Sequence, residues 1–157
     1  YLHAPAASGA NLRILEQALP DPPWTCVAYL LPELHGQNHA KCGLVLGNSS
    51  NNFKVTFGCG WSSSARIQIQ SYNSPGAYVS NYLDAPMMFP YPAWWRIIDD
   101  GTSRHYASSV SGRHWKHHLT HARTTQVAAN TIGFFAESNN STWPAGVLLV
   151  SWEVLAE

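Results

Sequence analysis

Charged residues are scarce in this sequence, and neither sign predominates. Asp, Glu, Lys and Arg make up 11% of the 157 residues, with nine basic residues against nine acidic ones. An average soluble domain carries about 25%. Because no basic stripe is present to neutralise phosphates, the composition argues against nucleic-acid binding. No apolar run approaches the roughly 20 residues that span a bilayer, which argues against membrane insertion.

The sequence also lacks the cysteine spacing of a zinc or thioredoxin-like site. Its three cysteines, Cys26, Cys42 and Cys59, are far apart, and no C-x-x-C pair occurs. Cys42 alternates in phase with Leu44 and Leu46, which places its thiol on the apolar side of a strand. We therefore expect buried free thiols, with one disulfide and one leftover thiol as the alternative.

No signal peptide is recognisable, and the chain begins at Tyr1 rather than at Met. The length is that of about one domain, and neither a linker nor an internal repeat divides it. We therefore expect a single domain over residues 1–157 that is part of a longer chain.

What the sequence does contain is a series of short apolar or alternating segments between turn-forming sequences such as PDPP, GNSSNN and NSPGA. The expected strands are Leu12–Leu19, Trp24–Leu31, Lys41–Gly47, Asn52–Cys59, Ala65–Ser71, Trp94–Asp99, Arg104–Ser109, Trp115–Leu119, Thr131–Glu137 and Gly146–Leu155. Residues 124–130 offer one helical turn. This pattern predicts an all-β fold, a two-sheet antiparallel β-sandwich or jelly roll.

Alternation also predicts which side chains are buried. In the segment Ala65–Ser71, Ile67 and Ile69 face the core, whereas Gln68 and Gln70 face outward and can hydrogen-bond a ligand or water. The last segment has one fully apolar face, which we expect to be buried and which consists of Leu148, Val150, Trp152 and Val154.

The stretch WWRIIDDGTSRHYASSVSGRHW, residues 94–115, combines three tryptophans with the turn pairs Asp-Gly and Ser-Gly. Together with AKCGLVLGN, TIGFFAES and VLLVSWEV, it resembles the concanavalin A-like, laminin-G-like jelly rolls of secreted bacterial glycan-active proteins and of phage tail and virion proteins. The resemblance covers most of residues 24–154. It implies two curved sheets packed face to face, with Trp94 and Trp115 serving the scaffold.

The resemblance further implies a non-catalytic recognition module, extracellular or in a virion, that binds a cell-surface glycan. A glycan site needs a flat aromatic ring and neutral polar groups for the sugar hydroxyls. Six aromatic residues in expected loops are the candidates, although each could instead anchor its loop: Trp61, Tyr72, Tyr78, Tyr82, Tyr91 and Trp143. The alternative is a structural virion domain, in which the same loops contact other virion subunits or further copies of this chain.

Catalysis is not expected, because the E-x-D-x-x-E strand motif of the glycoside hydrolases in the resembled family is absent. A diverged glycosidase would use an acid such as Glu137 or Asp99. The histidine-rich segment HWKHHLTH, residues 114–121, is interpreted as an exposed hairpin edge. No cofactor is expected. Calcium is the alternative, since oxygen ligands could come from Asn81, Asp84, Glu137, Asn139 and Asn140.

Overall fold

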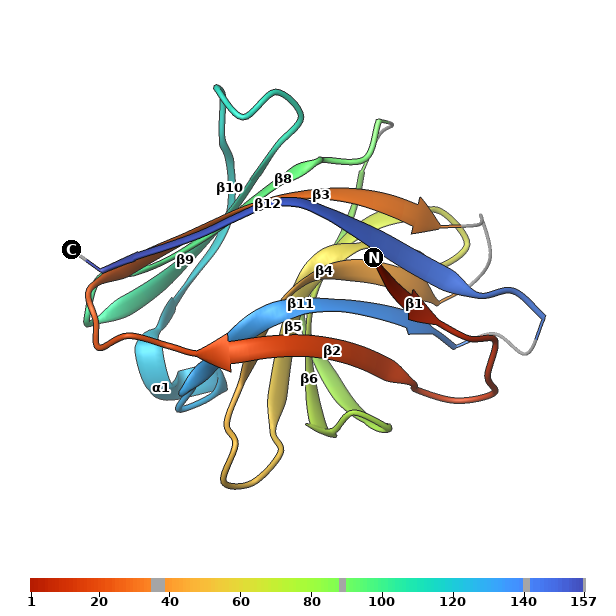
Figure 1. The fold of residues 1–157 in the computed structure, drawn as a ribbon, viewed down its shortest axis with the longest axis horizontal. Coiled ribbons are helices and arrows are strands. Elements are labelled where there is room, and N and C mark those ends of the chain that lie inside the picture. Colours follow the sequence, from red (N-terminus) through yellow and green to blue (C-terminus); the bar gives the residue numbers. More distant parts are fainter. Residues whose placement is uncertain (35–38, 88–89, 140–141, 157) are drawn as a thin grey trace.

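The computed structural model describes residues 1–34, 39–87, 90–139 and 142–156. Within these residues the chain forms two six-stranded sheets, which lie one above the other in Figure 1. Every strand pairing that joins neighbours in a sheet is antiparallel. The predicted all-β, two-sheet antiparallel sandwich is therefore confirmed. No helix in this part of the chain is long and apolar enough to cross a membrane.

Sheet A has the strand order β1-β12-β3-β8-β9-β10. Its strands are β1 (Leu2–Ala4), β12 (Ala145–Ala156), β3 (Trp24–Leu34), β8 (Trp94–Asp99), β9 (Ser103–Ser109) and β10 (Lys116–Ala122). A short helix, α1 (Arg123–Gln126), follows β10 and precedes β11.

Sheet B has the order β2-β11-β4-β5-β6-β7. Its strands are β2 (Leu12–Ala18), β11 (Thr131–Ser138), β4 (Ala40–Gly47), β5 (Lys54–Trp61), β6 (Ala65–Ser74) and β7 (Ala77–Pro86). The chain passes between the sheets several times, so each sheet is assembled from segments that are distant in sequence.

The ten expected strands are all present, with boundaries that differ by up to three residues. Two strands, β1 and β7, were not predicted. Strand β7 is an edge strand whose residues are exposed or only half buried, so its sequence carries no apolar alternation. The predicted helical turn at 124–130 corresponds to α1.

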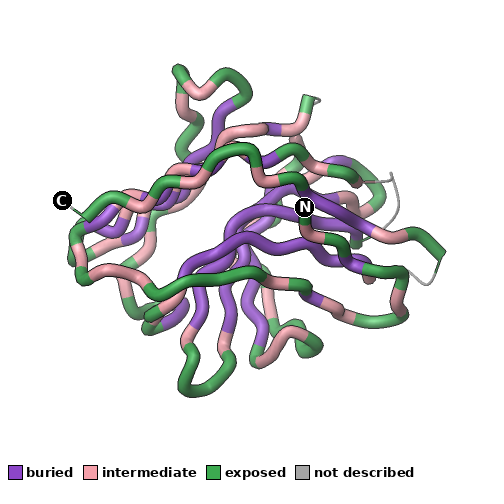
Figure 2. Tube along the Cα trace, viewed as in Figure 1, coloured by how far each residue is buried: buried purple, intermediate pink, exposed green. Residues whose placement is uncertain are grey.

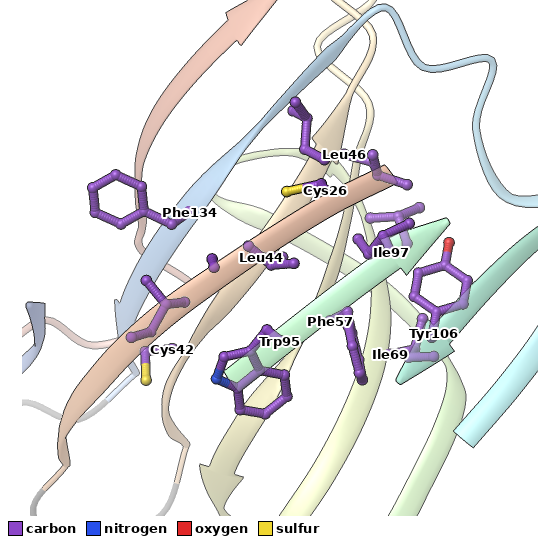
Figure 3. Close-up of a cluster of buried hydrophobic side chains, with 14 of the residues drawn as sticks. Cys26, Cys42, Leu44, Leu46, Phe57, Ile69, Trp95, Ile97, Tyr106 and Phe134 are labelled. Atoms are coloured by element: carbon purple, nitrogen blue, oxygen red, sulfur yellow. The ribbon is translucent and has the colours of Figure 1, made fainter. Parts of the chain in front are cut away.

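The core lies between the two sheets and is lined by alternate side chains of both. Figure 2 shows the burial concentrated along the central strands, and Figure 3 shows the side chains that meet there. The ring of Phe57 on sheet B lies edge-on to Trp95 and Tyr106 on sheet A, with centroids 5.1 and 5.3 Å apart. All three rings are fully buried, as the alternation on β5, β8 and β9 requires.

The prediction for the last strand is wrong in its first half. Leu148 and Val150 are 44% and 50% exposed, whereas Val147 is fully buried. Farther along, Trp152 and Val154 do pack against the core. A β-bulge in this part of β12, where it pairs with β3, adds a residue and so changes which face the later side chains reach.

The adjacent tryptophans divide between the two faces of sheet A. Trp95 points into the core. Trp94 lies on the other face, where its ring stacks on Tyr29 with a centroid separation of 4.8 Å and an angle of 7°. The Arg96 guanidinium carbon lies 4.3 Å from the ring centroid of Trp115. The rings of Trp94 and Trp115 thus pack against neighbouring side chains, in keeping with the scaffold role that the resemblance implies.

Candidate functional site

Sheet B curls so strongly that its two edges meet at one end. Strand β2 forms one edge and the β6–β7 hairpin forms the other, yet the backbone amide of Leu12 donates to the carbonyl of Pro75 at 2.9 Å. The face of sheet B that points away from sheet A is therefore hollowed, and we call it the concave face. A second, small apolar cluster is buried at this closed end, and it consists of Leu12, Val45, Tyr72 and Phe135.

Glycines in the central strands make room on the concave face. Gly43 on β4 is opposite Gly58 on β5, and a Cβ added to Gly58 would lie 2.0 Å from the carbonyl oxygen of Cys42. A Cβ on Gly60 would lie 2.6 Å from Cγ of Lys41. The aliphatic stem of Lys41 thus crosses β5 where that strand has no side chain, and reaches toward β6.

A buried ion pair forms one side of this face. The Lys41 ammonium on β4 lies 3.1 Å from Glu137 Oε2 on β11 and 2.9 Å from Gln70 Oε1 on β6. Lys41 and Glu137 are only 6% and 1% exposed. The Tyr72 hydroxyl lies 2.9 Å from both Glu137 Oε2 and Gln70 Oε1. Burial, reinforced by the Glu137 charge, raises the pKa of Tyr72, so its hydroxyl stays a neutral donor.

The network continues across β6 and β7. The Gln70 side-chain amide donates to Asn81 Oδ1 at 2.7 Å, and the Gln68 amide donates to Asp84 Oδ1 at 3.1 Å. The Arg66 guanidinium is paired with the same Asp84 carboxylate. In contrast, the buried Oε1 of Gln68 has no hydrogen-bond partner among the described residues. A buried acceptor of this kind costs about 1–3 kcal/mol unless a donor reaches it.

These side chains line a pocket of about 450 Å³, which we call the polar trough. Its sides carry both donors and acceptors, because Lys41, Glu137, Gln68, Gln70, Asn81 and Asp84 all line it. Tyr78, which is 48% exposed, adds an aromatic wall and lies edge-on to Tyr72 with a centroid separation of 5.8 Å. The trough can therefore offer hydrogen bonds and one ring face to a neutral polar ligand.

The structure places four of the six predicted site residues on strands rather than in loops. Tyr72 lies on β6, Tyr78 and Tyr82 lie on β7, and Trp61 is the last residue of β5, so the loop placement predicted for these four is wrong. For the three tyrosines the reason is that turn-forming residues around them conceal an edge hairpin with several register shifts. Tyr72 is fully buried and holds Glu137 and Gln70, whereas Tyr78 is open to a ligand.

The remaining predicted residues lie elsewhere. Tyr82 and Tyr91 pack against the main core, and burial raises the pKa of Tyr91 to about 12. Trp61 is half buried at the end of β5, and Trp143, 45% exposed, lies between β11 and β12. A ligand role for these four residues stays a prediction.

Some of the polar residues that line the trough can be predicted from the sequence. Gln68 and Gln70 were expected to face outward, and they do, although both are buried by the curl of sheet B. Asn81, Asp84 and Glu137 were considered as calcium ligands. Their grouping with Lys41 had no signal in the sequence, because it depends on strand pairings between distant segments.

Three of the five side chains considered for calcium already hold protein partners. Asp84 is paired with Arg66, Glu137 with Lys41, and Asn81 accepts from Gln70. Asn140 lies outside the described residues. Within those residues, no group of three or more His, Cys, Asp or Glu side chains is placed to hold a metal ion.

The second acid considered for catalysis, Asp99, lies in a different place from the trough. Its side chain is fully buried, with Oδ2 at 3.1 Å from Arg104 Nε and 3.0 Å from Arg123 Nε. These ion pairs tie β8 to β9 and to α1. In this structure Asp99 is held by arginines and has no exposed surface for a substrate.

Comparisons by sequence give no match, either with models of known families or with curated proteins. Solved structures do resemble the fold. A xylan β-1,4-xylosidase from Bacillus halodurans C-125 has a TM-score of 0.70 at 14% identity, over 96% of this chain and 31% of that one. A variant of the GH43 protein BlXynB from Bacillus licheniformis has a TM-score of 0.66 at 14% identity, over 92% and 33%.

A functionally unknown protein from Saccharomyces cerevisiae has a TM-score of 0.62 at 12% identity, over 92% of this chain and 73% of that one. At these identities the likeness concerns the fold alone. This chain spans about a third of the length of the two bacterial chains, so it corresponds to one part of each.

Proposed function

We propose that this chain is a non-catalytic glycan-binding domain and that it takes a neutral oligosaccharide in the polar trough of sheet B. The trough has the composition that a sugar requires. Amide, carboxylate and ammonium groups line its sides, and one tyrosine ring is exposed at its wall.

The observation that carries this proposal is the unpaired acceptor of Gln68. Among the described residues its Oε1 is buried without a hydrogen-bond partner, while its Nε2 donates to Asp84 Oδ1 at 3.1 Å. The amide is therefore held in one orientation, with its oxygen unpaired but covered by neighbouring atoms. A ligand hydroxyl that displaces these atoms would satisfy the oxygen and recover the free energy that its burial costs.

The ionised groups of the trough favour a neutral ligand. Lys41 is neutralised by Glu137, and Asp84 is neutralised by Arg66. A charged ligand would have to compete with these partners, whereas hydroxyl groups can join the existing hydrogen bonds. Tyr78 can stack on the apolar face of a sugar ring beside them.

The similar folds suggest the first ligand to test. Two of them are parts of chains described as a xylan β-1,4-xylosidase and a GH43 protein, so xylo-oligosaccharides are the natural probes. The cell-surface glycan and the phage or virion setting implied by the sequence resemblance stay predictions. An extracellular location stays one as well.

Calorimetric titration with xylohexaose, cellohexaose and mannohexaose tests the proposal. We expect saturable binding of at least one of them. Tyr78→Ala and Gln68→Met should each weaken that binding about tenfold or more, which is about 1.4 kcal/mol, without unfolding the domain. Tyr1→Ala is the matched control, because Tyr1 is an exposed tyrosine that precedes β1 of the other sheet.

Two results would contradict the proposal. One is binding that Tyr78→Ala and Gln68→Met leave unchanged, since the ligand would then lie elsewhere. The other is release of reducing sugar that Glu137→Gln abolishes, which would indicate a diverged glycosidase. Absence of binding to a broad glycan array, together with a stable oligomer that covers Tyr78, would support the assembly role instead.

A further inference from the structure

Two of the three cysteines face each other across neighbouring strands. Cys42 on β4 is directly opposite Cys59 on β5 in an antiparallel pairing. Both side chains point into the core and are essentially unexposed, at 0% and 1%. Cys26 is equally buried but belongs to β3 of sheet A, where it is paired with Ile97 and Val154. Figure 3 shows Cys42 and Cys26 on their separate strands.

The pairing of Cys42 with Cys59 has the geometry that a disulfide needs. Directly opposed residues of an antiparallel pair have Cα atoms about 4.5–5.5 Å apart, within the range of about 4.4–6.8 Å found for disulfides. The neighbouring pair on one side is Gly43–Gly58, so no other side chain crowds the two backbones there. Burial, together with a hydrogen bond to Cys42, raises the pKa of Cys59 well above its usual value.

We propose that Cys42 and Cys59 form an interstrand disulfide when the chain folds in the presence of a small-molecule disulfide such as oxidised glutathione. One cysteine thiolate attacks the glutathione disulfide, and a mixed disulfide forms as one glutathione thiolate leaves. The second cysteine thiolate then attacks the protein sulfur of that mixed disulfide, and the second glutathione leaves. The two cysteines lose two protons and two electrons, and one oxidised glutathione becomes two reduced ones. Cys26 stays a thiol.

The bond forms while the sheets are still coming together. In the finished core the raised pKa of Cys59 keeps its thiol protonated, and the attacking species is the thiolate. Hairpin β4–β5 joins consecutive strands and can pair before sheet A covers it. The crosslink then fixes β4 to β5 directly beneath Lys41 and Gly60, which lie on the concave side of the same strands.

The sequence positions of the cysteines provide a sharp test. Cys42 stands almost midway between Cys26 and Cys59, so chain entropy alone favours a Cys26–Cys42 bond as much as a Cys42–Cys59 bond. Only the folded pairing distinguishes them. Denatured protein is refolded in glutathione buffer, the remaining thiols are alkylated in denaturant, and the intact mass and the non-reduced peptides are measured.

We expect one alkylated thiol, the loss of two hydrogens in mass and a Cys42–Cys59 peptide. Cys26→Ala should keep the Cys42–Cys59 disulfide and show no alkylated thiol. Cys42→Ala and Cys59→Ala should each show two alkylated thiols and no disulfide. The oxidised protein should melt roughly 5 °C or more above the reduced one, because the crosslink restrains the unfolded chain. Oxidation in denaturant serves as the reference, and it should give the two bonds of Cys42 in comparable amounts.

Three alkylated thiols after refolding, or a bond that involves Cys26, would overturn the proposal. The masses are read on denatured protein, so a variant that folds poorly still gives an answer. The outcome is independent of the proposed glycan binding, because no ligand is used.

Discussion

The Lys41–Glu137 ion pair is the most demanding feature of the site. Both groups are almost completely removed from water. Lys41 donates to Glu137 and Gln70, and Glu137 accepts from Lys41 and Tyr72. Burying two charges rarely stabilises a fold compared with apolar side chains of the same size. The pair therefore adds no net stability compared with such a replacement, but the loss of one partner alone would leave an uncompensated buried charge.

Glu137→Gln should lower the free energy of unfolding by about 3 kcal/mol, because it leaves the Lys41 ammonium buried without its counter-charge. Chemical denaturation with urea measures this change. The double variant Lys41→Met/Glu137→Leu removes both charges and should return to within about 1 kcal/mol of the parent protein. If the double variant is as unstable as the single one, the pair itself is not the cause.

The sequence could predict only part of this network. The outward direction of Gln68 and Gln70 follows from simple alternation with Ile67 and Ile69. The burial of Lys41 does not, because its partner Glu137 is 96 residues away and the pairing arises only when β11 joins β4. Charged residues are normally read as exposed, and here the curl of sheet B overrides that rule.

At the scale of the element, glycines decide how closely β4 and β5 approach. Gly43 and Gly58 form a cross-strand pair without side chains, and Gly58 has backbone atoms within 2.0 Å of the place that a Cβ would take. This contact is with the backbone of Cys42, which cannot rotate away as a side chain could. The close approach helps to produce the bend that hollows the concave face.

Gly58→Ala should therefore destabilise the domain by about 2–3 kcal/mol, because the added methyl group forces β4 and β5 apart. Gly76→Ala is the control, since its Cβ would meet only the carbonyl oxygen of Ala10 at 3.7 Å, an ordinary contact. Thermal unfolding of the two variants makes the comparison. Equal midpoints would show that the strands adjust without cost and that the bend has another origin.

Alternation of apolar residues along the sequence predicted where most strands lie better than it predicted edge strands and bulges. Segments with buried alternate residues, such as Trp94–Asp99, have the boundaries that the sequence indicates. Strand β7 was not predicted, because an edge strand needs no apolar face. The predicted burial of Leu148 and Val150 is wrong, because the bulge in β12 changes which face these side chains reach. The edge position of β7 and the bulge in β12 both depend on neighbouring strands. The periodicity of a single segment therefore cannot predict them.

At the scale of the whole molecule, neutrality is the property that limits the choice of partner. Nine positive residues balance nine negative ones. The Glu137 and Asp84 carboxylates that line the trough are already paired with Lys41 and Arg66. Attraction between distant charges therefore contributes little to meeting a ligand. Ligand binding as proposed for the trough would therefore depend on hydrogen bonds and ring stacking at close range, which salt hardly affects.

The dissociation constant for a neutral oligosaccharide should consequently change less than about twofold between about 10 mM and about 1 M sodium chloride. Over this range the Debye length falls from about 30 Å to about 3 Å, so any long-range attraction would be lost. Titrations at the two salt concentrations measure the effect, and an oligogalacturonate of similar length provides the charged comparison. Because Lys41 and Arg66 are already paired with Glu137 and Asp84, they offer the uronate little attraction, and it should bind no better than the neutral sugar at low salt. Affinity that rises steeply as salt is removed would mean that an uncompensated charge, and not the polar trough, selects the ligand.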